Sequence, residues 1–266
     1  MIRAALIAAL VLLVLAPRAQ AAPTITMSGS PVAEAVVADL AYFYGHAVRR
    51  PPRFSLTGGD TNTGISDALR GIATAGLVSR NLGPGDPPGL VLSPLALSGI
   101  CLFTNKANPV PNLTRAEIQD VLAGRITSWA QIPGSTRTDA IVSATLSPAV
   151  GGRRVFESVF VDDTTPELYH PRTFATDDQL RRFVEQTPAA WGFADLALTR
   201  PVHRVDYEGV ACNRTTVRLG TYPAQRPLGV VTRGRPRGPL ARFLSWAAHS
   251  RTARRVISSR YVYRAP

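Results

Sequence analysis

The sequence of 266 residues is almost without lysine: Lys106 is the only one, although lysine and arginine together number 30 against 18 acidic residues, for a formal net charge of +12. A basic stripe interleaved with aromatic residues is typical of nucleic-acid-binding proteins. The arginines of this chain are spread along the sequence and form no such stripe. We therefore expect no nucleic acid as a partner. A basic surface of this kind attracts small anions and anionic surfaces instead.

The sequence also lacks, after its first residues, any apolar stretch approaching the roughly 20 residues that a membrane-spanning helix needs. The apolar run at residues 4–16 follows Arg3 and precedes the small-x-small triplet of residues 19–21. This order predicts a signal peptide at residues 1–21 and export to the periplasm, with an N-terminal membrane anchor as the alternative. No cysteine near the cleavage site can carry a lipid, so we expect a soluble mature chain without a lipid anchor or transmembrane segment.

Cysteine is scarce, and Cys101 and Cys212 are the only two. Because disulfides form in oxidising compartments, we predict a disulfide between these two residues of an exported chain. Two separate buried thiols are the alternative, since a spacing in the sequence does not show that two side chains meet.

The motifs of common hydrolases are missing as well. The chain has no Gly-x-Ser-x-Gly turn, and its histidines do not stand at a metal-ligand spacing such as His-Glu-x-x-His. We therefore predict a protein that is not an enzyme and that uses no cofactor or metal, and we disfavour the alternative of an exported hydrolase. The histidines are His46, His170, His203 and His249.

Helix-start signals are present and recur between strand-like segments. Ser30 and Pro31 predict an N-cap followed by the first helical residue, directly after a strand-like segment at residues 24–28. Thr114 and Glu117 predict a capping box at the start of another helix. Strands alternating with helices predict an α/β fold with largely parallel sheets, in which ligands bind at the carboxyl ends of strands.

Three polar loops directly precede predicted helices, where unpaired backbone N–H groups and the helix dipole stabilise an anion. Hydroxyl and amide side chains in these loops can bind oxygens, and Arg80 can form a bidentate, charge-assisted pair. Each loop is also explained as an ordinary helix cap, and Arg80 as a solvated surface residue. The candidate ligand-binding residues are Ser28, Gly29, Ser30, Asp60, Thr61, Asn62, Thr63, Ser79, Arg80, Gly151, Gly152 and Arg153.

Two stretches carry a resemblance to a known family. Residues 103–129 contain an Asn-Pro pair, a Leu-Thr-capped helix and the run Gly-Arg-Ile-Thr-Ser-Trp, and residues 220–228 read Gly-Thr-Tyr-Pro-Ala-Gln-Arg-Pro-Leu. Both are similar to the periplasmic phosphate-binding proteins of phosphate ABC transporters, which have the PBP-like, type II periplasmic binding fold. The matching segments keep their order over most of the chain.

The resemblance implies a two-lobed α/β fold, in which each lobe is a mostly parallel sheet flanked by helices and crossing hinge strands join the lobes. Lobe one is expected to be residues 22–97 plus 215–266, and lobe two residues 98–214. The crossing strands are expected at residues 90–103 and near Cys212.

The resemblance also implies a function: a monomeric protein captures phosphate or a related oxyanion in the interlobe cleft and delivers it to a membrane ABC permease. The chain departs from the family pattern in lobe two, where Val150-Gly151-Gly152 stands in place of Ser-Gly-Thr preceded by an arginine. Binding is therefore expected to depend chiefly on lobe one, and above all on Arg80. A family member that has lost its ligand and acts as a sensor or partner-binding protein is the alternative.

Overall fold

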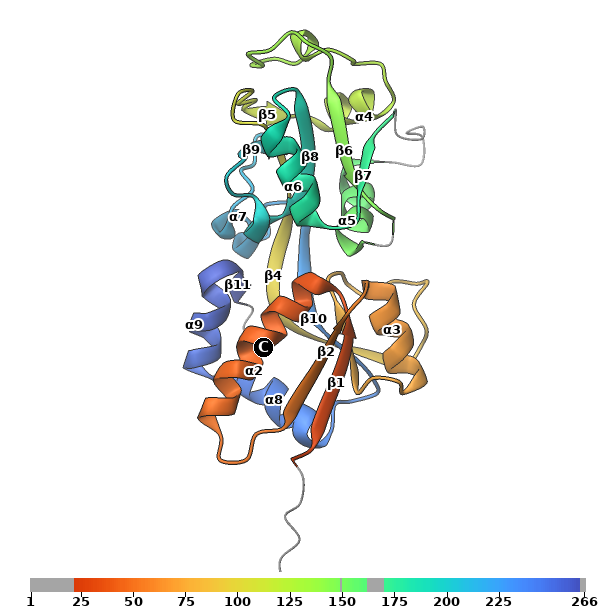
Figure 1. Cartoon of the computed structure of the whole chain (residues 1–266), viewed down its shortest axis with the longest axis vertical. Helices are drawn as coiled ribbons and strands as arrows, with labels where there is room; N and C mark the ends of the chain where they lie inside the picture. Colours follow the sequence, from red (N-terminus) through yellow and green to blue (C-terminus); the bar gives the residue numbers. More distant parts are fainter. Residues whose placement is uncertain (1–21, 149, 162–169, 264–266) are drawn as a thin grey trace, which may run out of the picture.

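The protein has two lobes stacked along its long axis (Figure 1), as seen in a computed structural model that describes residues 22–148, 150–161 and 170–263. The predicted signal peptide at residues 1–21 lies outside this part of the chain. The lower lobe in the figure consists of β1 (Thr24–Gly29), α2 (Pro31–Ala47), β2 (Arg53–Gly58), α3 (Thr61–Arg70), β3 (Ala75–Val78), β10 (Gln225–Arg233), α8 (Gly238–His249), α9 (Arg251–Arg260) and β11 (Val262–Tyr263).

The upper lobe is built from the middle of the chain, and one long strand belongs to both lobes. That strand is β4 (Leu90–Thr104). The remaining elements of the upper lobe are β5 (Asn112–Leu113), α4 (Arg115–Leu122), η1 (Trp129–Gln131), β6 (Val142–Leu146), α5 (Gly151–Phe160), β7 (Arg172–Phe174), α6 (Asp177–Gln186), β8 (Ala190–Asp195), η2 (Leu196–Leu198), β9 (His203–Tyr207) and α7 (Arg214–Leu219).

The sheet runs through both lobes in the order β2-β1-β3-β10-β4-β8-β6-β7. The first part of β4 pairs with β10 from Leu90 to Gly99, and its end pairs with β8 from Ile100 to Thr104. The predicted α/β, two-lobed fold is confirmed, but the sheet is mixed, because β4 and β10 run antiparallel to their neighbours. The second crossing strand is β10 and not the segment near Cys212, which packs inside the upper lobe.

Each lobe has its own hydrophobic core. Met27, Leu40 and Phe243 belong to the lower core, and the upper core is centred on aromatic side chains, including the stacked pair Phe156 and Phe193. The sequence-based boundary at residue 215 stays a prediction. On the packing of the cores we propose to place it near residue 224, because the upper core also includes Val217, Tyr222 and Ala224.

Local capping rules set the helix starts. Thr114 accepts a hydrogen bond from the backbone N–H of Glu117 and the Glu117 carboxylate accepts one from Thr114, which confirms the predicted capping box. Helix α2 begins at Pro31 as predicted, but the side chain of Ser30 makes no capping hydrogen bond. The hydroxyl of Ser30 is therefore not used by its own helix.

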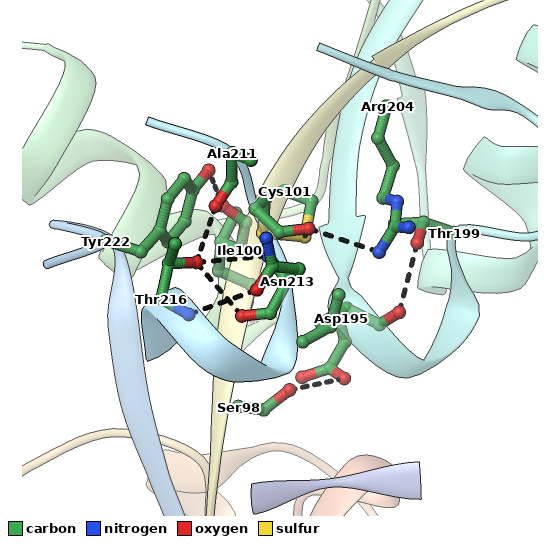
Figure 2. Close-up of a disulfide and its surroundings, with 12 residues drawn as sticks. Ser98, Ile100, Cys101, Asp195, Thr199, Arg204, Ala211, Asn213, Thr216 and Tyr222 are labelled. Atoms are coloured by element: carbon green, nitrogen blue, oxygen red, sulfur yellow. Dashed lines mark hydrogen bonds between the residues drawn. A yellow bond between two sulfur atoms is a disulfide. The ribbon is translucent and has the colours of Figure 1, made fainter. Parts of the chain in front are cut away.

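The predicted disulfide between Cys101 and Cys212 is confirmed (Figure 2), with the two Cα atoms 5.5 Å apart. Cys101 lies on β4 and Cys212 directly before α7, and both are buried. The surrounding polar groups are satisfied: Tyr222 donates its hydroxyl proton to the carbonyl of Ile100 (2.8 Å), and Arg204 donates to the carbonyl of Cys212 (3.1 Å). The disulfide thus ties the segment before α7 to the crossing strand.

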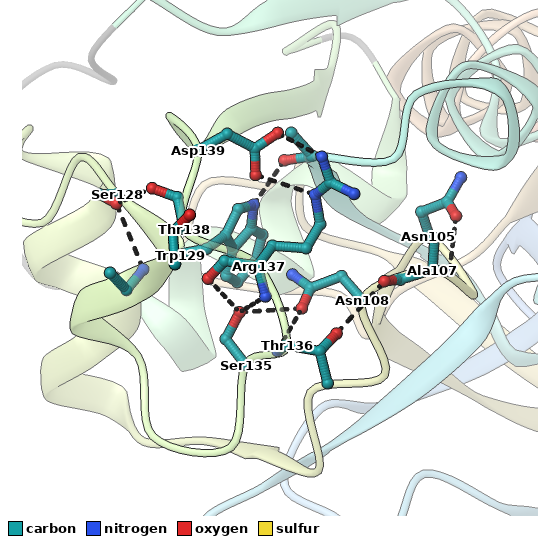
Figure 3. A network of polar contacts seen from close by, with 12 residues as sticks. Asn105, Ala107, Asn108, Ser128, Trp129, Ser135, Thr136, Arg137, Thr138 and Asp139 are labelled. Carbon is teal, nitrogen blue, oxygen red and sulfur yellow. Dashed lines mark hydrogen bonds and ion pairs between the residues drawn. The ribbon is translucent and has the colours of Figure 1, made fainter.

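The stretch at residues 103–129, which carries the resemblance, organises the upper lobe (Figure 3). Trp129 is buried and donates its indole N–H to the carbonyl of Ala189 at 2.7 Å. The amide oxygen of Asn108 accepts hydrogen bonds from the Ser135 hydroxyl (2.9 Å) and the Thr136 backbone N–H (3.3 Å). These contacts hold the loop at residues 132–140 against the lobe. The family-like residues of this stretch therefore have a structural role in the upper lobe.

Among residues 22–148, 150–161 and 170–263, no helix has the length and apolar character required to cross a membrane.

Candidate ligand-binding cleft between the lobes

A cavity of about 440 Å³ lies where the two lobes meet. Its lining comes from the starts of α2, α3, α5 and α6, together with η2, β10 and the end of α9. Of the residues predicted from the sequence, the lining includes Ser30, Asp60, Thr61, Ser79 and Gly151. Helix starts from both lobes therefore converge on one space.

Two hydroxyls form the polar wall of the lower lobe. The side-chain oxygens of Thr61 and Ser79 are 3.3 Å apart, and the backbone N–H of Ser79 donates to Thr61 Oγ1 at 3.2 Å. Both residues are buried, and Asp60 fixes the loop by accepting the N–H groups of Asn62 and Thr63. The cap on α3 thus places the hydroxyl of its first residue at the cleft.

Gly151 brings the upper lobe into contact with this wall. It is the first residue of α5, and a Cβ atom added to it would stand 2.5 Å from Ser79 Oγ and 2.9 Å from Thr61 Oγ1. Real Cβ atoms do not approach oxygen atoms so closely, so only glycine allows this approach. The backbone at the start of α5 lies directly opposite both hydroxyls.

Several predicted residues stand outside the lining because their polar groups are used elsewhere. Ser28 donates its hydroxyl proton to Asp67 Oδ2 at 2.7 Å, and Gly29, with φ of +130°, lies against the Leu77 carbonyl. Asn62 and Thr63 are likewise absent from the lining. These residues shape the loops without facing the cavity.

Arg80, which the sequence predicts as the main ligand residue, has its guanidinium paired outside the cavity lining, and its role in binding stays a prediction. Its guanidinium forms a bidentate ion pair with Asp86 (2.6 and 2.7 Å) and donates to the amide oxygen of Asn62 at 3.1 Å. The hydrogen bonds from Arg80 lower the pKa of the Asp86 carboxyl. Arg80 therefore anchors the loop that contains Asp86, and it does not line the cavity.

Gly152 and Arg153 also lie outside the lining. Gly152 faces Ile100 and Leu146 behind the start of α5. Arg153 donates to Glu157 at 2.6 Å and to Thr145 Oγ1 at 2.6 Å, so its charge is paired along its own helix.

Arg226 on β10 is one of several lining residues that are not among the predicted ones, and Asp177, Asp178 and Arg260 are the other charged ones. Its side chain is 2% exposed and donates to Asp195 Oδ2 at 2.8 Å. Asp195 is fully buried and also accepts hydrogen bonds from Ser98 Oγ (2.8 Å) and the backbone N–H of Ala197 (3.0 Å). Within the described chain, Nε of Arg226 has no hydrogen-bond partner.

Asp177, the first residue of α6, lines the cavity together with Arg226 and completes the buried charge cluster. Its Oδ1 accepts the backbone N–H of Asp195 at 2.9 Å, and it is 5% exposed. Burial raises the pKa of the Asp177 carboxyl; Arg226 opposes this rise, and the Asp195 carboxylate adds to it.

A family model described as the PBP superfamily domain matches residues 16–251. The chain belongs to the PBP superfamily. Phosphate-binding protein PstS 2 of Streptococcus agalactiae is 31% identical over 88 residues, which are 33% of this chain and 30% of that protein. The protein of the same name from Streptococcus pneumoniae is 32% identical over 77 residues, or 29% of this chain and 26% of its own. The aligned segments thus span less than a third of these relatives' length.

Two solved structures match most of this chain. A substrate-binding protein from Clostridium perfringens, solved with bound phosphate, has a TM-score of 0.81 at 22% identity and covers 91% of this chain and 100% of its own. An ABC-type phosphate transport receptor from Vibrio cholerae has a TM-score of 0.75 at 23% identity and covers 90% and 100%. At this identity the two structures establish the fold of this PBP-superfamily member.

The sequence did contain a signal for Arg226. It is an arginine that directly precedes the apolar stretch from Pro227 to Val231 on the same strand, and it lies within the family-like segment at residues 220–228. A charge in a buried strand of a PBP-superfamily protein needs a partner, but the partner is 31 positions away along the chain. Nothing local pointed to Asp195.

Replacing Asp177 by Asn is expected to raise the free energy of unfolding at neutral pH. Because the folded state raises the pKa of Asp177, the stability that this group provides is present at low pH and is lost as pH rises through the folded pKa. Asn keeps the acceptor for the N–H of Asp195 and has no charge to bury. Urea unfolding from acidic to neutral pH checks this prediction. The free energy of unfolding of the variant should exceed that of the wild type by an amount that grows with pH, and a difference that does not change with pH contradicts the prediction.

Proposed function

We propose that this chain is a periplasmic solute-binding protein that captures phosphate or a related oxyanion between its lobes and delivers it to a membrane ABC permease. The observation that carries the proposal is the meeting of Thr61 and Ser79 from one lobe with the start of α5 from the other. Hydroxyls and unpaired N–H groups at a helix start stabilise an oxyanion. The names of the PstS relatives and the phosphate in the Clostridium perfringens structure agree with this ligand.

In this proposal the protein binds its ligand without chemical change, works as a monomer and closes its lobes by a hinge motion at β4 and β10. The predicted signal peptide supports the periplasmic location. Three histidines, the commonest general bases, are placed outside the cavity with a ring nitrogen against a backbone carbonyl oxygen: His46 with Tyr42, His203 with Val110 and His249 with Ser245.

Thr61→Val is expected to weaken phosphate binding about tenfold to a hundredfold. Valine has the shape of threonine but no hydroxyl, and a hydrogen bond to a charged group contributes roughly 1.5–3 kcal/mol. Calorimetric titration of the mature protein with phosphate, sulfate and arsenate is the measurement. The matched control is Thr57→Val, at an exposed position of β2, which should bind as the wild type does.

The same titration can also contradict the proposal. If none of the three oxyanions releases heat or raises the melting temperature of the wild type, oxyanion capture is wrong, because a ligand that binds only the folded state must raise that temperature. The sensor or partner-binding alternative then takes its place.

A further inference from the structure

The cavity between the lobes is larger than an inorganic oxyanion requires. Its volume is about 440 Å³, whereas a tetrahedral oxyanion occupies roughly the space of two or three water molecules at about 30 Å³ each. Pockets of about 300–1,000 Å³ are typical of small organic ligands. In this conformation the cleft therefore has room for a ligand larger than bare phosphate.

Two of the hydroxyl groups in the lining lie together, while Ser30, Thr176 and Tyr261 also line the cavity. Thr61 and Ser79 lie within hydrogen-bond distance of each other, and the backbone of Gly151 faces both. Arg226 adds a buried guanidinium. It lies next to Gly152, which is in the first turn of α5 together with Gly151. These residues are donors that can face an anionic head, while the guanidinium of Arg226 is paired with Asp195 and the carboxylates of Asp60, Asp177 and Asp178 line the same cavity.

Much of the remaining lining is apolar and only partly buried by protein. Val32 and Ala35 come from the first turns of α2, and Ala197 and Leu198 come from η2. Val150 adds another apolar side chain directly beside Gly151. Water held against such side chains is released when an apolar ligand group replaces it, and each buried methylene then contributes about fourfold in affinity.

We propose that the ligand of this cleft is a small organic phosphorus oxyanion, an alkylphosphonate or alkyl phosphate, with its head at Thr61, Ser79 and Arg226 and its arm against Ala35 and Leu198. The inference rests on the proposed function and names its substrate class. Val150 stands at the position where the phosphate-binding family has a serine. Its apolar side chain can contact an alkyl arm but cannot donate a hydrogen bond to a phosphate oxygen.

Calorimetric titration of the mature protein with inorganic phosphate and with methyl-, ethyl- and propylphosphonate tests the inference. Affinity should rise about fourfold with each added carbon, so ethylphosphonate should bind more than tenfold more tightly than phosphate. Ethyl phosphate, tested beside ethylphosphonate, identifies the preferred linkage. If inorganic phosphate binds as tightly as every organic compound, the inference is overturned while the proposed function stands; if nothing binds, both fail.

Ala35→Leu places bulk in the apolar part of the cavity and keeps a good helix former in α2. In this variant the affinities for ethyl- and propylphosphonate should no longer exceed the affinity for inorganic phosphate, so the gain from the alkyl arm is lost. Ala197→Leu tests the part of the lining that comes from η2 if the first variant folds poorly. The matched control is Ala47→Leu, at the exposed end of α2, which should keep the gain; equal chain-length dependence in all three variants contradicts the proposed arm site.

Discussion

Replacing Asp195 by Asn is expected to lower the free energy of unfolding by about 3–5 kcal/mol. Asp195 is fully buried and Arg226 is 2% exposed, with 2.8 Å between Oδ2 and Nη2. Asparagine can still accept one hydrogen bond from Ser98 or Ala197, but it removes the carboxylate that is directly paired with the buried guanidinium. The cost comes from burying that guanidinium without its paired carboxylate and not from the ion pair's own net contribution, which in buried pairs is small.

Urea unfolding of a double-mutant cycle measures the effect. Arg226→Met combined with Asp195→Asn removes both charges, so the double variant should recover a large part of the loss. Asp120→Asn is the control, because it removes a carboxylate from an ion pair with Arg125 whose side chains are 36% and 59% exposed, and such pairs contribute little. A loss for Asp195→Asn no larger than that of the control would contradict the assignment of a tightly coupled buried pair.

Gly151→Val is expected to weaken binding of the cleft's ligand about tenfold to a hundredfold. Even a Cβ at this position would stand 2.5 Å from Ser79 Oγ and 2.9 Å from Thr61 Oγ1, and valine adds two methyl groups beyond it. Overpacking costs roughly 1–3 kcal/mol, and each 1.4 kcal/mol is a tenfold change in affinity. The lobes relieve the overlap by separating, which removes the start of α5 from the ligand.

Two measurements check this expectation. Titration with phosphate and ethylphosphonate gives the affinity, and small-angle scattering gives the radius of gyration, which should be larger for the variant than for the wild type. Gly45→Val is the matched control, since Gly45 lies in helix α2 with open space around its Cα. Wild-type affinity and radius in Gly151→Val would mean that the two lobes do not close at this glycine.

The local features of the chain were predictable from the sequence. The capping box of Thr114 and Glu117 and the start of α2 at Pro31 depend on residues within one helical turn, so a short sequence window contains all the atoms involved. The polar loops before α2, α3 and α5 were located for the same reason. The α/β class also followed, because alternating strands and helices can bury their apolar faces in only a few ways.

The tertiary structure alone decided that Arg226 lines the cavity and Arg80 does not. Arg80 follows Ser79 at the end of a strand and looks available to an anion, yet the loop after β3 folds back and places Asp86 against its guanidinium. Arg226 looks like a misplaced charge in an apolar strand, yet β4 and β8 bring Ser98 and Asp195 to it from distant parts of the chain. No rule based on neighbouring residues distinguishes these two environments.

The sequence by itself determined where the helices start, which loops are polar, the α/β class and the two cysteines available to pair. The tertiary structure decided that those cysteines meet, that β10 is the second crossing strand, and that Gly151 lies against Thr61 and Ser79. The physical reason is distance along the chain. Capping and hydrophobic periodicity act within a few residues, whereas the cavity is formed by contacts between segments that only the packing of two complete lobes brings together.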